Sequence, residues 1–148
     1  MGLFDKVLDN ISGEKISLSN AESFAGILLG TVSADGYISD EEKSSLWNKL
    51  DTMKLFSNWS DEQFNSMFNK LFGIQKKQGN DQLLKLCSSF LIPELKETAF
   101  AVAVDLVLAD GSVEEAEKQF LINLQSILEI DENLAVKIIE VLAIKNKG

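Results

Sequence analysis

The sequence predicts an all-α protein, a helical bundle of about eight helices that forms a single domain over residues 1–148. Apolar residues recur at spacings of three and four along most of the chain, which is the period of an amphipathic helix. No segment shows the convincing alternation of apolar and polar residues that is typical of a half-buried strand. An apolar fraction of 45% in 148 residues is sufficient for one sizeable core.

Four helices are predicted before residue 80. The first lies within residues 1–17, and its apolar face is formed by Leu3, Phe4, Val7, Leu8 and Ile11. The next three each begin at a serine that is followed three residues later by Glu or Gln, which is the pattern of a capping box. These serines are Ser19, Ser39 and Ser60.

Glycine and proline mark several boundaries and contacts of the helices. Gly26 and Gly30 lie inside the apolar second helix, where they leave room for a closely packed neighbour. Residues 73–79 are predicted to form a connection. Pro93 suits the first turn of an apolar helix that ends at Asp110-Gly111. The remaining helices are expected over residues 83–90, 120–128 and 131–142.

The sequence contains an internal repeat with a shift of 75 residues. This shift places Ala34-Asp35-Gly36 on Ala109-Asp110-Gly111, and it pairs the acidic starts of the two following helices. The pairs are Asp40 with Glu115 and Glu42 with Glu117. We therefore expect two three-helix repeats, over residues 19–77 and 80–146, and we hypothesise that a pseudo-twofold axis brings the two turns together.

The charge of the chain excludes several classes of function. There are 14 basic residues, all lysine, and 23 acidic residues, which give a net charge of −9. Without histidine there is no Ser-His-Asp triad and no His-ligated zinc, and the single cysteine cannot form an internal disulfide. Nucleic acid is a poor partner, because no cluster of positive charge is present to contact phosphates. No signal peptide or membrane-spanning segment is recognisable, which favours the cytoplasm.

The two acidic turns are the strongest candidates for a functional site. The spacing Asp-Gly-x-(Ile/Val)-x-x-x-Glu resembles the second half of an EF-hand loop, but the first-half ligands are missing. A weaker possibility is one divalent cation, Ca²⁺, Mg²⁺ or Mn²⁺, shared by carboxylates of both turns. The predicted ligands are Asp35, Asp40, Glu42, Asp110, Glu115 and Glu117. On spacing alone the structural alternative is favoured, in which the same residues form turns and cap helices.

Taken together, these motifs resemble the TerB tellurite-resistance family of bacteria. The resemblance spans nearly the whole chain and includes the opening Met1-Gly2-Leu3-Phe4-Asp5-Lys6-Val7 and the two acidic turns. It implies a duplicated all-helical domain, a cation site formed by the acidic residues, and a role in stress response and tellurite resistance. It also implies protein partners in an assembly near the inner face of the membrane. Ala116 interrupts the second acidic run, which makes Glu115 the less certain ligand.

Three further features have simpler interpretations. The aromatic residues Phe56, Trp59, Phe64, Phe68 and Phe72 are expected to form core rather than a ligand pocket. Cys87 is expected to be buried, because no cationic neighbour is visible that would activate it as a thiol. The first helix is expected to dock onto the domain rather than onto a membrane, although peripheral association remains open.

The sequence thus predicts a non-enzymatic stress-response protein that binds a cation or a protein partner. The alternative is a structural adaptor whose acidic turns are only helix caps. A metal-dependent hydrolase is least favoured, since nothing specifies a substrate.

Overall fold

The computed structural model describes residues 16–109 and 111–147, and within them it contains seven α-helices and one short 3₁₀ helix, with no strand. The all-α prediction is confirmed. The first predicted helix lies outside the described residues apart from Ile16 and Ser17, which are not helical. The elements are α2 (Asn20–Val32), α3 (Asp40–Asp51), η1 (Lys54–Phe56), α4 (Asp61–Gln78), α5 (Asn80–Phe90), α6 (Pro93–Leu108), α7 (Glu115–Ile127) and α8 (Glu132–Lys145).

The helix starts predicted from the serine pattern are confirmed. At Ser19, Ser39 and Ser60 the side-chain oxygen accepts a hydrogen bond from the backbone N–H three residues later, at 3.1, 3.1 and 3.2 Å. The Glu or Gln at that later position accepts in return from the serine N–H. Pro93 lies in the first turn of α6, and Asp131 caps α8. These starts are therefore fixed by local hydrogen bonds.

The predicted connection over residues 73–79 is wrong, because α4 continues through Gly73 to Gln78. One glycine lowers helix stability by only about 1 kcal/mol, and the burial of Ile74 outweighs this. The helix ends at Gly79, whose φ of 92° lies in the left-handed region that glycine adopts without strain.

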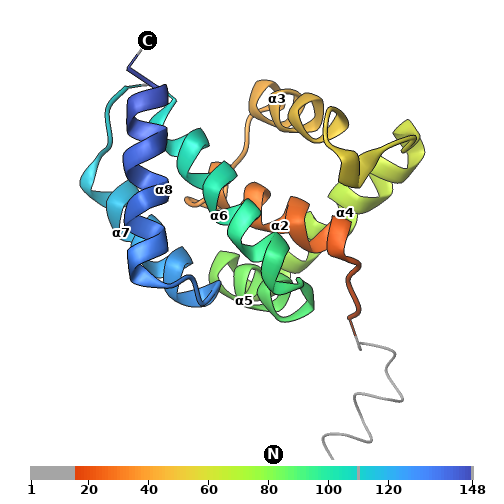
Figure 1. The fold of residues 1–148 in the computed structure, drawn as a ribbon. Helices are drawn as coiled ribbons and strands as arrows, with labels where there is room; N and C mark the ends of the chain where they lie inside the picture. The colour runs from red at the N-terminus through yellow and green to blue at the C-terminus, as the bar shows by residue number, and fades with distance from the viewer. Residues whose placement is uncertain (1–15, 110, 148) are drawn as a thin grey trace, which may run out of the picture.

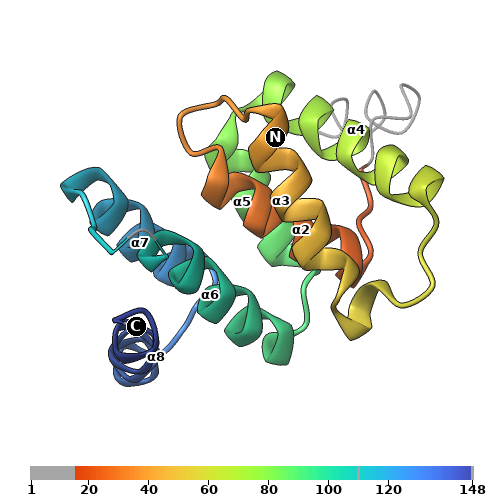
Figure 2. The same cartoon turned by 90° about the horizontal axis from the view of Figure 1, so that it is seen from above.

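Helix α2 forms the centre of the molecule and packs against α5 on one side and α6 on another (Figure 1). Seen from above, α6, α7 and α8 form one group, and α2, α3, α4 and α5 form the other (Figure 2). Phe24, Ile27 and Leu28 of α2 are fully buried between them. This central position explains why α2 is apolar on most of its faces.

The close approach predicted at the two glycines of α2 is confirmed. A Cβ added at Gly26 would collide with Cys87 Sγ of α5, and one added at Gly30 would lie 2.6 Å from Leu84 Cδ2. Asn80 Nδ2 also donates a 3.0 Å hydrogen bond to the Gly30 carbonyl. The absence of side chains at these positions therefore sets the distance between α2 and α5.

The aromatic residues of the first half form part of the core, as expected. Phe64 stacks between Trp47, at a centroid distance of 5.2 Å, and Phe56, at 5.6 Å. Phe56, Phe64 and Phe68 are buried. Aromatic pairs at these separations add to the free energy of area burial, so this cluster holds α3 and η1 against α4.

Asp105 of α6 connects three helices. Its carboxylate accepts hydrogen bonds from Lys145 Nζ at 3.1 Å and Asn146 Nδ2 at 2.9 Å, both at the end of α8. Lys49 Nζ of α3 lies 3.9 Å from the same group. The Asn146 hydrogen bond, with smaller effects of the two lysines, lowers the pKa of Asp105 below its usual value.

No helix in the described part of the chain is long and apolar enough to cross a membrane.

Candidate functional site: two acidic turns and an apolar groove

The first acidic turn lies between α2 and α3. Gly36 has a φ of 87° and donates a 2.8 Å hydrogen bond to the Ser33 carbonyl, which closes the turn. Asp35 Oδ1 accepts a 3.1 Å hydrogen bond from the Tyr37 N–H. The aspartate therefore stabilises the turn locally, as Asp does in many such turns.

The second turn, between α6 and α7, shares the positive φ and the closing hydrogen bond of its glycine with the first. Gly111 has a φ of 81° and donates a 3.1 Å hydrogen bond to the Leu108 carbonyl. The residues that precede α3 and α7 have nearly identical dihedral angles: φ is −76° and ψ is 162° at Ser39, and φ is −75° and ψ is 160° at Glu114. Asp110, one of the six predicted ligands, lies outside the described residues.

Two of the predicted ligands take part in helix caps. Glu42 Oε1 accepts from the Ser39 N–H at 3.1 Å, and Glu117 Oε1 accepts from the Glu114 N–H at 2.9 Å. Within residues 16–109 and 111–147, the second oxygen of each carboxylate has no hydrogen-bond partner. Each group therefore caps its helix and still has one oxygen for another ligand.

The two remaining predicted ligands in the described chain are exposed at the starts of α3 and α7. Glu115 lies 3.7 Å from Lys118 Nζ in an exposed ion pair one turn along α7. The Asp40 side chain has no hydrogen-bond or ion-pair partner among the described residues. Exposed pairs of this kind stabilise a helix by only a few tenths of a kcal/mol, so Glu115 is only weakly held by Lys118.

A cavity of about 370 Å³ joins the two turns. Asp35 of the first turn and Glu117 in the first turn of helix α7 both line it, although they are 82 positions apart in the sequence. Its other walls are Thr31, Ala34, Val107, Ala116 and Phe120. The turns thus lie at the same end of the molecule, and the cavity combines two carboxylates with a mainly apolar wall.

Glu42 does not line this cavity. It lines a second one of about 290 Å³ between α3 and α6, together with Glu41 and apolar residues such as Leu46 and Leu106. In the described part of the chain, no three Asp, Glu or Cys side chains are arranged to hold a metal ion. The structure therefore brings Asp35 and Glu117 to one cavity and places Glu42 at another.

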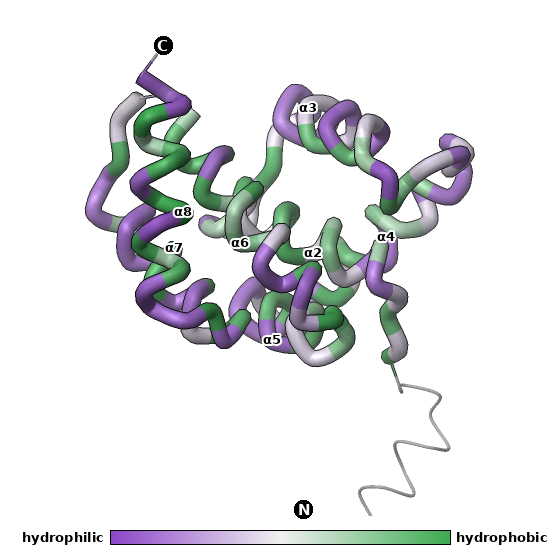
Figure 3. Tube along the Cα trace, in the orientation of Figure 1, coloured by the Kyte–Doolittle hydropathy of each residue, from purple (hydrophilic) through white to green (hydrophobic). Residues whose placement is uncertain are grey.

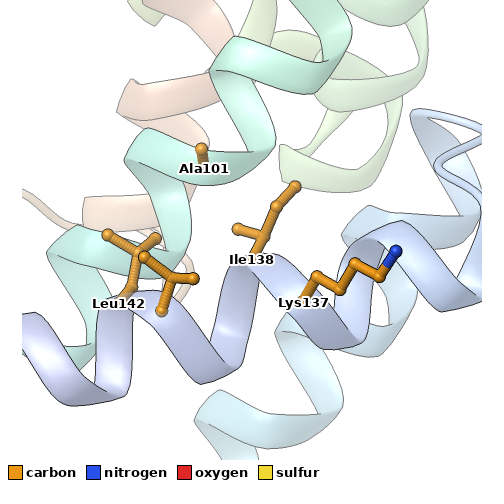
Figure 4. A pocket seen from close by; sticks show the side chains of 5 residues that line it. Ala101, Lys137, Ile138 and Leu142 are labelled. Atoms are coloured by element: carbon orange, nitrogen blue, oxygen red, sulfur yellow. The ribbon is translucent and has the colours of Figure 1, made fainter.

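A further feature, which the repeat pattern does not reveal, is an apolar groove of about 290 Å³ between α6 and α8. Ile138 and Leu142 point from α8 toward α6 near Ala101, while the Lys137 side chain extends along α8 (Figure 4). Val141 at the rim is 63% exposed, and Ile144 beyond it is 67% exposed. The groove is therefore an apolar surface that the described part of the chain leaves accessible.

The sequence carries a signal for this surface. Nine of the fourteen residues of α8 are apolar, which is more than the single face against α6 can bury. The hydropathy colouring shows apolar residues around α8, whereas polar residues dominate the outer side of α3 (Figure 3). Only Ala135 of α8 is buried. A comparison of the number of apolar residues in α8 with the number that one buried face can hold would have identified α8 as a helix with exposed apolar surface.

Cys87 is buried between α2 and α5, as expected. Burial, with a smaller effect of the negative charge on Glu22, raises the pKa of the Cys87 thiol to about 12. The thiol is therefore protonated at neutral pH, and its role in the native structure is packing.

Comparison of the chain with models of protein families, with curated proteins and with solved structures finds no match. The resemblance to the TerB family accordingly depends on the motifs of the sequence.

Proposed function

We propose that this chain is a non-enzymatic, TerB-like binding protein of the bacterial stress response, including tellurite resistance, and that its two acidic turns share a divalent cation. The observation that carries the proposal is the common cavity of Asp35 and Glu117. Carboxylates that line one cavity repel each other, and a hard cation such as Ca²⁺, Mg²⁺ or Mn²⁺ would offset this repulsion.

The charges around the turns support this proposal. No lysine pairs with Asp35, Asp40, Glu42 or Glu117 in the described part of the chain. A full set of ligands would draw on Asp110 and on water in addition to Asp35 and Glu117. Because calcium and magnesium take six or more oxygen ligands and accept water among them, a two-carboxylate cavity is a suitable starting point.

The proposal includes a structural duplication. We propose that α2, α3 and α4 form one repeat and that α6, α7 and α8 form the other, with α5 as an additional helix. The support is the positive φ of Gly36 and Gly111, the similar dihedral angles of Ser39 and Glu114, and the start of α3 and α7 at positions 75 residues apart. A cytoplasmic location at the inner face of the membrane is part of the same proposal.

Calorimetric titration of the chelator-treated protein with CaCl₂, MgCl₂, MnCl₂ and ZnCl₂ tests the cation site. We expect saturable binding of at least one of the hard ions, and loss of that binding in Asp35→Asn/Asp110→Asn. The matched control is Asp51→Asn/Asp61→Asn, which removes the same charge from exposed positions at the far end of α3 and the start of α4. Absence of saturable binding, or equal binding by both double variants, would refute the shared site.

The thermal stability of the same proteins gives a second measure. A ligand that binds only the folded state at 100 times its Kd adds about 2.7 kcal/mol to the free energy of unfolding. The melting temperature of the native chain should therefore rise with cation, and that of Asp35→Asn/Asp110→Asn should not.

The second candidate function is a protein-interaction adaptor whose acidic turns are caps alone. The apolar groove between α6 and α8 favours it, because exposed apolar surface of this kind marks interaction sites. Val141→Glu/Ile144→Glu separates the two functions. It leaves cation binding unchanged, and it abolishes association with partner proteins if α8 is the docking face.

A further inference from the structure

A second groove lies beside α4, where the described chain begins. It has a volume of about 340 Å³ and is lined by Ile16, Lys70, Gly73, Ile74, Lys77 and Gln78. This groove is separate from the acidic turns and from the groove between α6 and α8. Its position matters because the fifteen preceding residues join the domain at Ile16, inside the groove.

The path of the chain at this point is fixed by two contacts. Lys70 Nζ donates a 2.8 Å hydrogen bond to the Ser17 carbonyl and forms a 3.1 Å ion pair with Glu22. Leu18 is buried in the core. The described chain therefore begins at a defined place, directly beside α4.

Gly73 is a second, independent observation. It lies in the interior of α4 at an exposed position, where glycine is a poor helix former. No atom of the described residues outside the helix lies within 4 Å of a Cβ placed there. At Gly26 and Gly30 a glycine accommodates a neighbouring helix, whereas at Gly73 the described part of the chain supplies no neighbour.

Charge and apolar pattern indicate what fills the groove. The second half of α4, residues 64–78, carries Lys70, Lys76 and Lys77 and no acidic residue. The segment before Ile16 carries three acidic residues together with an apolar face at helical spacing. The acidic residues are Asp5, Asp9 and Glu14, which outnumber the two lysines of the segment, Lys6 and Lys15. The apolar face is Leu3, Phe4, Val7, Leu8 and Ile11.

We propose that residues 1–15 dock their apolar face into this groove of the same molecule, over Gly73 and Ile74, with their carboxylates toward the lysines of α4. The glycine then permits a close approach of two helices, as Gly30 does between α2 and α5. The docked segment covers the exposed face of α4 at Gly73 and makes the N-terminus an integral part of the domain.

A nitroxide attached to the full chain at Asn69→Cys, an exposed position of α4 one turn before Gly73, tests the proposal by NMR. The native Cys87 is buried, so the label reacts with the introduced thiol alone. We expect amide signals of residues 3–11 to lose more than half their intensity, and to recover it when the nitroxide is reduced. If the signals of residues 3–11 are unchanged, the proposal is overturned. This holds both for a segment that is free in solution and for one that binds vesicles of phosphatidylglycerol.

A mixed sample distinguishes docking in the same molecule from docking on a second copy. ¹⁵N-labelled chain without nitroxide is combined with unlabelled chain that carries it, at equal concentration. We expect no loss of intensity for residues 3–11 in this mixture. Loss in the mixture equal to that in the single chain would assign the groove to a second copy and overturn the proposal.

Two pairs of variants test the groove and the apolar face separately. Gly73→Leu fills the groove and should abolish the broadening, whereas Ser66→Leu, at an exposed position of the same helix, should preserve it. Val7→Asp/Ile11→Asp should abolish it, whereas Asn10→Asp/Ser12→Asp adds the same charge at polar positions and should not. An identical response within either pair would contradict the docking.

Discussion

Replacement of Gly30 by alanine tests the packing of α2 against α5. In an exposed helix this change would raise the free energy of unfolding by about 1 kcal/mol, because alanine is the better helix former. In this fold the new Cβ would lie 2.6 Å from Leu84 Cδ2 and 3.1 Å from Asn80 Oδ1. Carbon atoms in contact prefer about 3.5–4.0 Å, so Leu84 or the whole of α5 must move by roughly 1 Å.

The expected effect follows from three contributions. Overpacking a core costs about 1–3 kcal/mol, and weakening the hydrogen bond from Asn80 to the Gly30 carbonyl costs about 1 kcal/mol more. The gain in helix propensity offsets about 1 kcal/mol. We therefore expect Gly30→Ala to lower the free energy of unfolding by about 1–3 kcal/mol, which for a chain of this length lowers the melting temperature by roughly 3–9 °C.

Urea denaturation followed by circular dichroism, together with thermal melting, measures this change. The matched comparison is Gly30→Ala in a Leu84→Ala background, where the closest obstructing atoms are absent. Leu84→Ala alone should cost about 2–5 kcal/mol, since Leu84 is only 1% exposed. In that background Gly30→Ala should be neutral or stabilising. If Gly30→Ala raises the melting temperature of the otherwise native chain, the reasoning about helix separation is refuted.

Three further predictions concern Asp105, Cys87 and Ser39. Asp105→Asn should lower the free energy of unfolding by about 1 kcal/mol at pH 7, because the ion pairs of Asp105 are lost. The pKa of Asp105 is lowered in the folded state, so the difference in unfolding free energy between the two proteins should be full above about pH 4. It should vanish as the pH falls through the folded-state pKa. Thermal melts of both proteins from pH 2 to pH 7 measure it, and a constant difference would contradict it. In the folded chain, Cys87 should not react with a chromogenic disulfide reagent at about pH 8. It should react fully in about 6 M guanidinium, which unfolds a domain of this kind. Rapid labelling of the folded chain would contradict the burial of Cys87. Ser39→Ala should cost about 1 kcal/mol in urea, since it removes the cap of α3, and no loss would show that the cap is dispensable.

Local signals in the sequence predicted most of the helix boundaries. The capping boxes at Ser19, Ser39 and Ser60 and the proline at the start of α6 require only neighbours within one turn, so they are legible without the fold. The predicted end of α4 was wrong because it depends on a tertiary contact. A glycine at residue 73 reads locally as a break, and only the burial of Ile74 against the core shows that the helix continues.

The candidate site divides in the same way. The repeated Asp-Gly turns and the acidic starts of α3 and α7 are properties of the sequence. Asp35 and Glu117 line one cavity while Glu42 lines another. This arrangement depends on how α2, α3, α6 and α7 pack, which spacing along the chain does not specify. The composition of α8 predicts more apolar surface than one face can bury. This surface is exposed to solvent because α6 covers only one side of α8.

The sequence by itself determined that this chain is helical, where most helices begin, and that its excess negative charge is concentrated at two equivalent turns. The helices and their starts follow from short-range periodicity and hydrogen bonding, which act within one turn of helix, and the position of the charge is read directly from the residue types. The tertiary structure alone decided which carboxylates share a cavity, which glycines separate helices, and that Asp105 joins α3, α6 and α8. Those outcomes arise from contacts between residues tens of positions apart, whose energies exist only when the helices are packed together.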